Sequence, residues 1–323
     1  MSFVLVLFLQ YILFSKGQNF VRGILKFSSF FVYFGMALFL LLIIGENFTP
    51  VVNSLKLSLS FANFFDKSNL VPLLTVTGTL FAYFSILILN FGDYSRYVKN
   101  DKELIRGNLS IILNFILLSF FSILIVVGSD IILAKNGISL DKLLTSPNDI
   151  IGKLNNTFLT VVALIFITIA SASTNLIANY IPSKNSLINF IPQKLNAKSS
   201  GILMIILSFF VGVFWLSYLS QIGVLSLIDT IGSFFGPIFG IIVADYFVIN
   251  NSNLDSKELF SSKLDSKYFY SNGWQLKGLY SVFIGFVFAS STIWNINLNF
   301  LHSFSWIIGA LISFVTYYLL ASK

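Results

Sequence analysis

The stretch IASASTNLIANY, residues 169–180, lies inside an apolar run that is long enough to cross a bilayer, yet it contains two serines, a threonine and two asparagines. The residues before it, FLTVVALIFIT (158–168), are almost entirely apolar. Unpaired polar groups in hydrocarbon are costly, so these side chains must face protein or water. The stretch therefore predicts a membrane helix that turns a hydrogen-bonding face toward the interior of the protein.

The composition of the 323-residue chain, with 56% hydrophobic and 10% charged residues, is that of an integral membrane protein. Its mean hydropathy is +0.86. A helix needs ~20 apolar residues to cross a ~30 Å hydrocarbon core. Runs of this kind cover 28–45, 71–92, 108–134, 156–181, 201–219, 224–249, 278–296 and 299–321. We therefore predict an all-α, polytopic membrane protein, and the absence of cysteine excludes disulfides and thiolate metal sites.

The basic residues give the expected topology. The net charge of +7 is spread over short loops between apolar runs, which argues against a nucleic-acid surface. Of the 20 Lys and Arg residues, 15 fall in the loops 15–27, 93–107, 182–200, 250–277 and at the C-terminus; the other five are Lys56, Lys67, Lys135, Lys142 and Lys153. By the positive-inside rule, the first set is cytoplasmic. We expect a multi-pass protein of the cell membrane, with a cytoplasmic C-terminus and an external Met1.

The first residues, MSFVLVLFLQYILFSKGQNF, are too short an apolar run for a comfortable span. They have neither the basic start nor the small-residue cleavage site of a signal peptide. We interpret the chain as a fragment that lacks an N-terminal portion. The alternative is a short, tilted first helix.

The polar helix has two stripes. Ala170, Ser173 and Thr174 share one face, at positions i, i+3 and i+4. A backbone carbonyl and two hydroxyls supply hard, neutral oxygen ligands, which suit a small cation such as Na⁺. The alternative is that the hydroxyls bond back to a carbonyl one turn earlier.

The second stripe contains Ser171, Asn175 and Asn179, at i, i+4 and i+8. An amide offers both a donor and an acceptor, so it suits a planar ligand with N–H and C=O edges. Alternatively, the asparagines hold two helices together.

The segment TVTGTLFAYFSILILNFGDYSRYVKND (75–101) places Gly78 where a helix can break or pack closely. Tyr83 and Phe84 supply aromatic faces that can stack on a flat ring, or that simply pack. Asp93 and Arg96 are spaced i, i+3, which predicts a structural ion pair.

The segment IDTIGSFFGPIFGIIVADYFVIN (228–250) combines glycines with a proline, which predicts a kinked or tightly packed helix. A proton carrier would need a carboxylate near the middle of the membrane. Only Asp229 and Asp130 are even loosely placed for that role.

Together these motifs resemble the nucleobase:cation symporter-1 family, the permeases for cytosine, purines, uracil, thiamine, allantoin and hydantoins. The resemblance is carried, in the family's order and spacing, by NFGDYSRYVKND (90–101), ASASTNLIAN (170–179), GPIFGIIVADYFVI (236–249) and NGWQLKG (272–278). It implies an inverted five-helix-repeat transporter fold of twelve helices, with broken first and sixth helices and a site at the membrane midplane.

FVLVLFLQYILFSKGQNFVRGILKF (3–27) resembles the family's fourth helix and the loop into the fifth. The chain then corresponds to helices four to twelve, in a single transporter domain (1–323). The resemblance divides it into a remnant of the first repeat (1–70), the second repeat (71–249) and two C-terminal helices (250–323).

The resemblance also assigns roles. It implies Na⁺ coordination by the Ala170 carbonyl and by the Ser173 and Thr174 hydroxyls. Asn179 matches the asparagine that hydrogen-bonds the heterocycle, and Asn175 lies beside it on the same stripe. Phe84 stands where relatives have a stacking tryptophan and Tyr83 where they have a small residue, so the particular substrate is left open.

The function expected is cation-coupled import of a nucleobase or related planar heterocycle, of the cytosine, purine, uracil, allantoin or hydantoin type. The coupling ion is Na⁺ or H⁺, with no other cofactor. The expected partners are the substrate, the cation and membrane lipid, without nucleic acid. The alternative is an inactive truncated transporter or an interaction subunit. An intramembrane protease is disfavoured, because the single histidine, His302, lies at an outer helix end, where we expect it to be solvated.

Overall fold

The computed structural model is helical, and the part of the chain that it describes contains no β-strand. It describes residues 2–15, 18–45, 47–58, 66–138, 144, 147–153, 157–214, 218, 224–261 and 263–322. Within these ranges, 8 helical segments are long and apolar enough to cross a membrane: Arg22–Ile44, Ser68–Leu89, Asp101–Lys135, Thr160–Phe190, Ala197–Phe214, Asp229–Ile249, Leu276–Trp294 and Ile296–Ala321. The prediction of an all-α, polytopic membrane protein is confirmed.

The chain divides into two compact units, which are described separately. Unit 1 comprises Met1–Phe64 and Gly92–Val213, and unit 2 comprises Phe65–Phe91 and Phe214–Lys323. The units cut across the predicted boundaries at residues 70 and 249, and the assignment of the chain to repeats stays a prediction.

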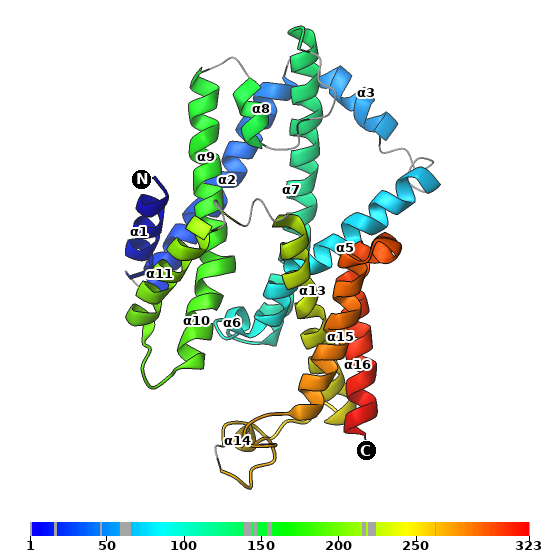
Figure 1. Cartoon of the computed structure of the whole chain (residues 1–323). Coiled ribbons are helices and arrows are strands. Elements are labelled where there is room, and N and C mark those ends of the chain that lie inside the picture. Colours follow the sequence, from blue (N-terminus) through cyan, green and yellow to red (C-terminus); the bar gives the residue numbers. More distant parts are fainter. Residues whose placement is uncertain are drawn as a thin grey trace. The chain divides into compact units, whose positions relative to one another are not determined.

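Unit 1 contains most of the first half of the chain (Figure 1). Its elements are α1 (Ser2–Ser15), α2 (Gln18–Ile44), α3 (Phe48–Ser58), α6 (Phe91–Ser95), α7 (Asp101–Lys135), α8 (Pro147–Lys153), α9 (Thr157–Asn175), the π-helical turn η1 (Leu176–Tyr180), α10 (Ile181–Phe190) and α11 (Ala197–Phe214). Helix α2 packs against both α7 and α9.

Helix α7 begins at Asp101, earlier than the apolar run at 108 suggests, because polar residues stabilise its first turn. The side chain of Asn100 accepts a hydrogen bond from the N–H of Glu103 at 2.9 Å, as an N-cap does. Glu103 also forms an ion pair with Arg106 at 2.9 Å. Hydropathy alone could not locate this start.

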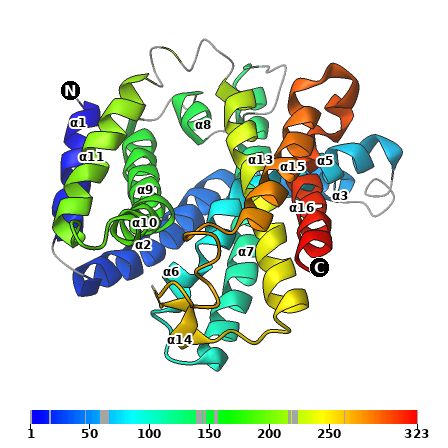
Figure 2. The ribbon, with the colours of Figure 1, turned by 60° about the horizontal axis from the view of Figure 1, so that its bottom comes forward.

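Unit 2 consists of α5 (Lys67–Leu89), α13 (Val224–Val243), the π-helical turn η3 (Ala244–Ile249), α14 (Ser256–Leu259), α15 (Leu276–Trp294), the 3₁₀ segment η4 (Ile296–Phe304) and α16 (Ser305–Ala321). Helices α13, α15 and α16 lie side by side in Figures 1 and 2 and form the main contacts of the unit.

Small residues let these helices approach closely. A Cβ atom on Gly236 or Gly240 of α13 would clash with the backbone carbonyls of Trp306 and Ala310 on α16. The Ser313 hydroxyl donates to the carbonyl of Ser281 at 2.7 Å and ties α16 to α15. Close backbone packing of this kind is typical of helices in membranes, so the predicted tight packing of the 228–250 segment is confirmed.

Helix α5 decides between the two alternatives given for Gly78. The helix does not break there, because α5 is continuous from Lys67 to Leu89. Gly78 instead allows close packing, because a Cβ atom there would clash with the carbonyl of Ser303 in η4. The helix ends only at Asn90, whose N–H caps the carbonyl of Ile86.

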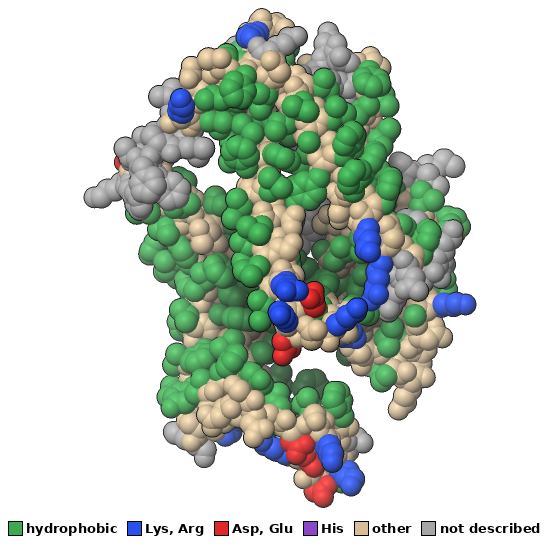
Figure 3. Space-filling view, turned by 180° about the vertical axis from the view of Figure 1, so that it is seen from behind, with side chains coloured by type: hydrophobic (Ala, Val, Ile, Leu, Met, Phe, Trp, Pro, Cys, Tyr) green, Lys and Arg blue, Asp and Glu red, His purple; other side chains and the backbone are tan. Residues whose placement is uncertain are grey.

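Apolar side chains dominate the surface. Phe30, Leu41, Ile116 and Phe283 are among many that are more than 60% exposed, as expected for side chains that contact lipid tails. On the face shown in Figure 3, hydrophobic side chains cover most of the surface and charged ones gather in a few places.

Candidate functional site

The polar stretch that opened the sequence analysis spans a change of helix type. Helix α9 ends at Asn175, the turn η1 follows, and α10 continues from Ile181. Within η1 the N–H of Ile181 bonds to the carbonyl of Leu176, a spacing of five residues where an α-helix has four. Single π-helical turns of this kind are frequent at functional sites. The turn begins directly after Asn175 and contains Asn179. The two predicted asparagines are therefore not placed as residues i and i+4 of an ideal α-helix.

The two asparagines contact each other. Asn179 Nδ2 donates to Asn175 Oδ1 at 2.6 Å. Asn179 is exposed and Asn175 is half-buried. The bond uses one donor and one acceptor, so the Asn179 carbonyl and the Asn175 amino group still have hydrogen-bonding capacity. An acceptor and a donor side by side match the C=O and N–H edge of a planar heterocycle.

The three predicted cation ligands lie one turn before the asparagines. The Ser173 hydroxyl donates to the carbonyl of Ala170 at 2.9 Å, which is the back-bonded arrangement named above as the alternative. The bond brings two of the predicted ligand oxygens together, and each keeps lone pairs. The Thr174 side chain is exposed. The role of these residues toward Na⁺ stays a prediction.

The two predicted aromatic residues belong to unit 2. Tyr83 and Phe84 lie on α5 with ring centroids 5.1 Å apart and planes at 88°, an edge-to-face pair. Tyr83 is 76% exposed. The structure thus brings five of the seven predicted residues together in unit 1 and the other two together in unit 2. Their union in one binding site stays a prediction.

A polar cluster beside η1 was only partly predicted. Asp93, whose side chain is 8% exposed, accepts from Arg96 at 2.5 Å, which confirms the predicted ion pair. The same oxygen also accepts from Asn185 Nδ2 of α10, at 3.0 Å. The neighbouring Tyr94 hydroxyl donates to the carbonyl of Ile177 in η1, at 3.2 Å. Helical spacing cannot reveal these two contacts, because they join residues more than 80 positions apart.

The electrostatics favour Tyr94 as a donor. Burial, together with the adjacent Asp93 carboxylate, raises the pKa of Tyr94 above its ordinary value. The neutral phenol is thereby favoured, and it can donate a hydrogen bond to the carbonyl oxygen of Ile177.

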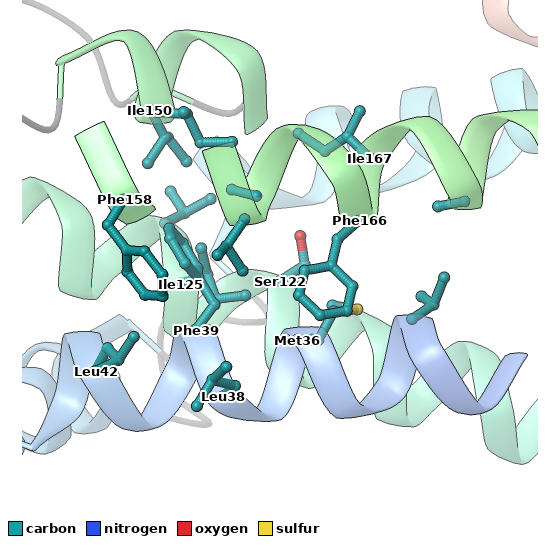
Figure 4. Close-up of a pocket in the computed structure, with 17 residues that line it drawn as sticks. Met36, Leu38, Phe39, Leu42, Ser122, Ile125, Ile150, Phe158, Phe166 and Ile167 are labelled. Atoms are coloured by element: carbon teal, nitrogen blue, oxygen red, sulfur yellow. The ribbon is translucent and has the colours of Figure 1, made fainter. Parts of the chain in front are cut away.

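Unit 1 also contains an apolar cavity of about 240 Å³ between α2, α7, α8 and α9. Figure 4 shows Met36, Phe39, Ile125, Ile150 and Phe166 around it. Ser122 is the one side chain with a polar group in its described lining, and Ala170 lies at one end. Because small-molecule sites need several converging polar groups, this cavity does not fit a heterocycle.

In unit 2, His302 has a partner that the sequence did not suggest. Its Nε2 lies 3.0 Å from Asp229 Oδ2, and the two side chains are 34% and 35% exposed. We expected His302 to be solvated and considered Asp229 as a proton carrier. The structure instead pairs them between the first part of α13 and η4.

In the part of the chain that the structure describes, eight helices are long and apolar enough to cross a membrane, and one of them contains a pair of hydrogen-bonded asparagines. These features define a multi-pass membrane protein. The model of the family described as "Permease for cytosine/purines, uracil, thiamine, allantoin" matches residues 2–320. The chain belongs to this family, which is described as one of permeases, and the resemblance read from the motifs is confirmed.

Three curated relatives carry permease names. The allantoin permease of Bacillus subtilis (strain 168) is 28% identical over 246 residues, which cover 76% of this chain and 48% of the relative. The putative allantoin permease of Escherichia coli (strain K12) is 23% identical over 95% of this chain and 61% of the relative. The purine-uracil permease NCS1 of Arabidopsis thaliana is 23% identical over 64% of this chain and 33% of the relative. The chain thus spans about half the length of these relatives. No solved structure shows significant similarity to it.

Proposed function

We propose that this chain forms part of a permease that imports a planar heterocycle of the nucleobase or allantoin type, coupled to Na⁺ or H⁺. The observation that carries the proposal is the Asn175–Asn179 pair at the π-helical turn of a membrane helix. A heterocycle with adjacent C=O and N–H groups satisfies both amides. A ligand without them would cover the amides without satisfying them, and a polar group that becomes buried and unpaired costs about 1–3 kcal/mol.

Family membership supports transport, and the names of the relatives support allantoin first, with purine and uracil next. Tyr83 and Phe84 supply flat faces that would stack on the ring, worth ~0.5–1.5 kcal/mol beyond the area that they bury.

For the coupling ion, Na⁺ is favoured over H⁺. Ala170, Ser173 and Thr174 offer neutral oxygens one turn from the asparagines. Asp229, one of the two carboxylates considered for proton transfer, lies within hydrogen-bond distance of His302. Cation and substrate then bind on neighbouring stripes of one helix, and each orders the segment that the other uses. Alternating access follows from the movement of one group of helices against the rest.

The test is binding and uptake of radiolabelled allantoin and uracil by the chain expressed in a host without these activities. Saturable binding that increases with Na⁺ and is weakened roughly 10- to 100-fold in Asn179→Leu is the expected result. Stimulation by an inward proton gradient, with no effect of Na⁺, would assign the coupling to H⁺. Absence of binding to either compound, by folded protein, would contradict the proposal and favour an interaction subunit without transport of its own.

A further inference from the structure

The starting point is a missing donor in η1. In the π-helical register the carbonyl of Leu176 accepts from Ile181, so the next carbonyl, that of Ile177, would accept from residue 182. Residue 182 is proline, which has no N–H to donate. The backbone therefore leaves the Ile177 carbonyl without its donor in this register, inside a helix that crosses the membrane.

Tyr94 supplies a donor at this point. Its hydroxyl reaches the Ile177 carbonyl at 3.2 Å from the short helix α6, which lies 83 residues earlier in the chain. The burial that raises its pKa keeps the hydroxyl protonated. Ile177 is half-buried, and a carbonyl left unsatisfied away from water costs free energy, so the bond stabilises the π register relative to alternatives.

A second contact holds the same helix on the other side of the proline. The buried Asp93 carboxylate accepts from Asn185, which follows Pro182 by three positions on α10. Two adjacent residues of α6 thus form hydrogen bonds with this helix on either side of Pro182, at Ile177 and at Asn185. Arg96 neutralises the carboxylate, so that it can remain buried.

We infer that Tyr94 is a positioning residue that replaces the N–H lost at Pro182, fixes the π-helical turn and so orients Asn179. Asp93 and Asn185 form the second half of this clamp. The effect on Asn179 as a substrate-binding residue rests on the proposed function. The effect on the backbone of η1 does not.

The natural chain contains no cysteine, so Ala178→Cys introduces a single reporter into η1, next to Asn179. We would measure its rate of labelling by a methanethiosulfonate reagent in four backgrounds: otherwise natural, Tyr94→Phe, Pro182→Ala, and both changes together. Tyr94→Phe removes only the donor, so labelling should rise roughly three- to tenfold as the turn opens more often.

Pro182→Ala is the decisive background. It returns an N–H to the backbone at residue 182, so the Ile177 carbonyl has a backbone donor in either helical register: residue 182 in the π register and Ile181 in the α register. The added Tyr94→Phe change should then have an effect below about twofold, a non-additivity that marks a shared partner. Asn185→Ala should also raise labelling, but Pro182→Ala should not suppress that rise, because the Asp93 contact does not involve the proline. Tyr280→Phe, at a ring that is 61% exposed on α15, is the matched control.

Three results would overturn the inference. The first is a Tyr94→Phe labelling rate equal to that of Tyr280→Phe. The second is an undiminished Tyr94→Phe effect in the Pro182→Ala background. The third is that Pro182→Ala suppresses the effect of Asn185→Ala as strongly as it suppresses that of Tyr94→Phe. If Tyr94→Phe does not fold, recovery of folded protein in the double variant supports the inference, and failure of both variants contradicts it.

Binding of radiolabelled allantoin to the same variants, without the reporter, tests the functional consequence. Affinity should fall in Tyr94→Phe and recover in the double variant. If the natural chain binds neither allantoin nor uracil while the labelling pattern holds, the proposed function fails and the positioning role stands. If the natural chain binds allantoin and Tyr94→Phe binds it equally well with unchanged labelling, the positioning role alone fails.

Discussion

The two π-helical turns, η1 in unit 1 and η3 in unit 2, share a backbone deviation and differ in what surrounds it. Around η3 the Asp245 carboxylate accepts from the Tyr317 hydroxyl at 2.5 Å and from the Asn250 amide at 3.1 Å, and Gln275 donates to the Tyr317 oxygen at 2.5 Å. Around η1 one side-chain donor arrives from outside, at 3.2 Å, and Asn179 remains exposed. We call η3 the anchor of unit 2, because side-chain hydrogen bonds hold it to other elements. The turn η1, in contrast, belongs to the candidate binding site of unit 1.

The residues that follow each turn explain the difference. After η3 the N–H of Asn250 bonds to the carbonyl of Asp245 at 2.9 Å, and the N–H of Ser252 bonds to that of Tyr246 at 2.8 Å. Asn251 and Ser252 have φ of 47° and 61°, so the chain turns back over the end of the helix. After η1, the N–H of Ile181 still bonds to the Leu176 carbonyl, but Pro182 has no N–H for the next carbonyl. A side chain from another helix takes its place.

The largest expected effect is on the anchor. Tyr317 is 1% exposed, so Tyr317→Ala should leave a cavity and unpair Asp245, with a loss of about 3–5 kcal/mol in the free energy of unfolding. Denaturant unfolding in detergent measures it. Tyr318→Ala, at a neighbouring residue that is 43% exposed, is the control. Equal losses in the two variants would remove the distinction between the turns.

The next effect concerns the site. Asn179→Leu should weaken binding of allantoin roughly 10- to 100-fold, because the heterocycle loses its amide partner. Stability should change little, since Asn179 is exposed. The matched control is Asn189→Leu, at an exposed position of α10. A large loss of stability in Asn179→Leu, with binding unchanged, would make η1 a second anchor.

A smaller effect is expected at the predicted cation ligands. Thr174→Ala should weaken the Na⁺ stimulation of allantoin binding about fivefold or more, and by linkage reduce the effect of allantoin on Na⁺ affinity by the same factor. Thr168→Ala is the control, because the Thr168 hydroxyl bonds back to Leu164 at 2.7 Å on the same helix. Unchanged Na⁺ stimulation in Thr174→Ala would reassign Thr174 to helix packing.

The smallest effect is a dependence on pH. Burial, with smaller contributions from Asp245 and Tyr268, raises the pKa of Tyr270 near η3. The stability linked to its neutral form is fully present below the ordinary pKa near 10 and is lost as pH rises through the raised value. Because the ring is 46% exposed, solvent reduces the effect. The difference between the unfolding midpoints at pH 8 and above pH 10 should be slightly smaller in Tyr270→Phe than in the natural chain. An equal difference in the two proteins would show that Tyr270 does not contribute to the pH dependence.

Much of the site could be predicted from local pattern. The spacing of Asn175 and Asn179 on a membrane helix indicated that they share a face, and they are in contact. The Asp93–Arg96 pair also followed from spacing. Sequence reasoning missed Tyr94 and Asn185 as partners of this helix, because contacts across more than 80 residues depend on the packing of α6 against α10. Pro182 could have indicated such a partner. A proline in a membrane helix leaves an earlier backbone carbonyl without its N–H donor, so a donor from elsewhere is needed.

For the fold, too, local patterns were predictable from the sequence and contacts between distant residues were not. Hydropathy located the membrane helices, whereas Gly78 fitted either a break or a close contact, and only the position of Ser303 decides for contact. His302 was expected in solvent because it lies at a helix end, and no local pattern connects it with Asp229, which is 73 residues away.

The contacts of Gly236 and Gly240 with the Trp306 and Ala310 carbonyls also limit how unit 2 can move. Sliding of two helices requires side chains that shift between rotamers while the backbones stay apart. Here a carbonyl of α16 occupies the space left by each missing side chain of α13, so no layer of side chains lies between the helices at these points. Shear between α13 and α16 therefore has no layer of flexible side chains to adjust at these two points. We expect α16 to follow α13 in any displacement of α13.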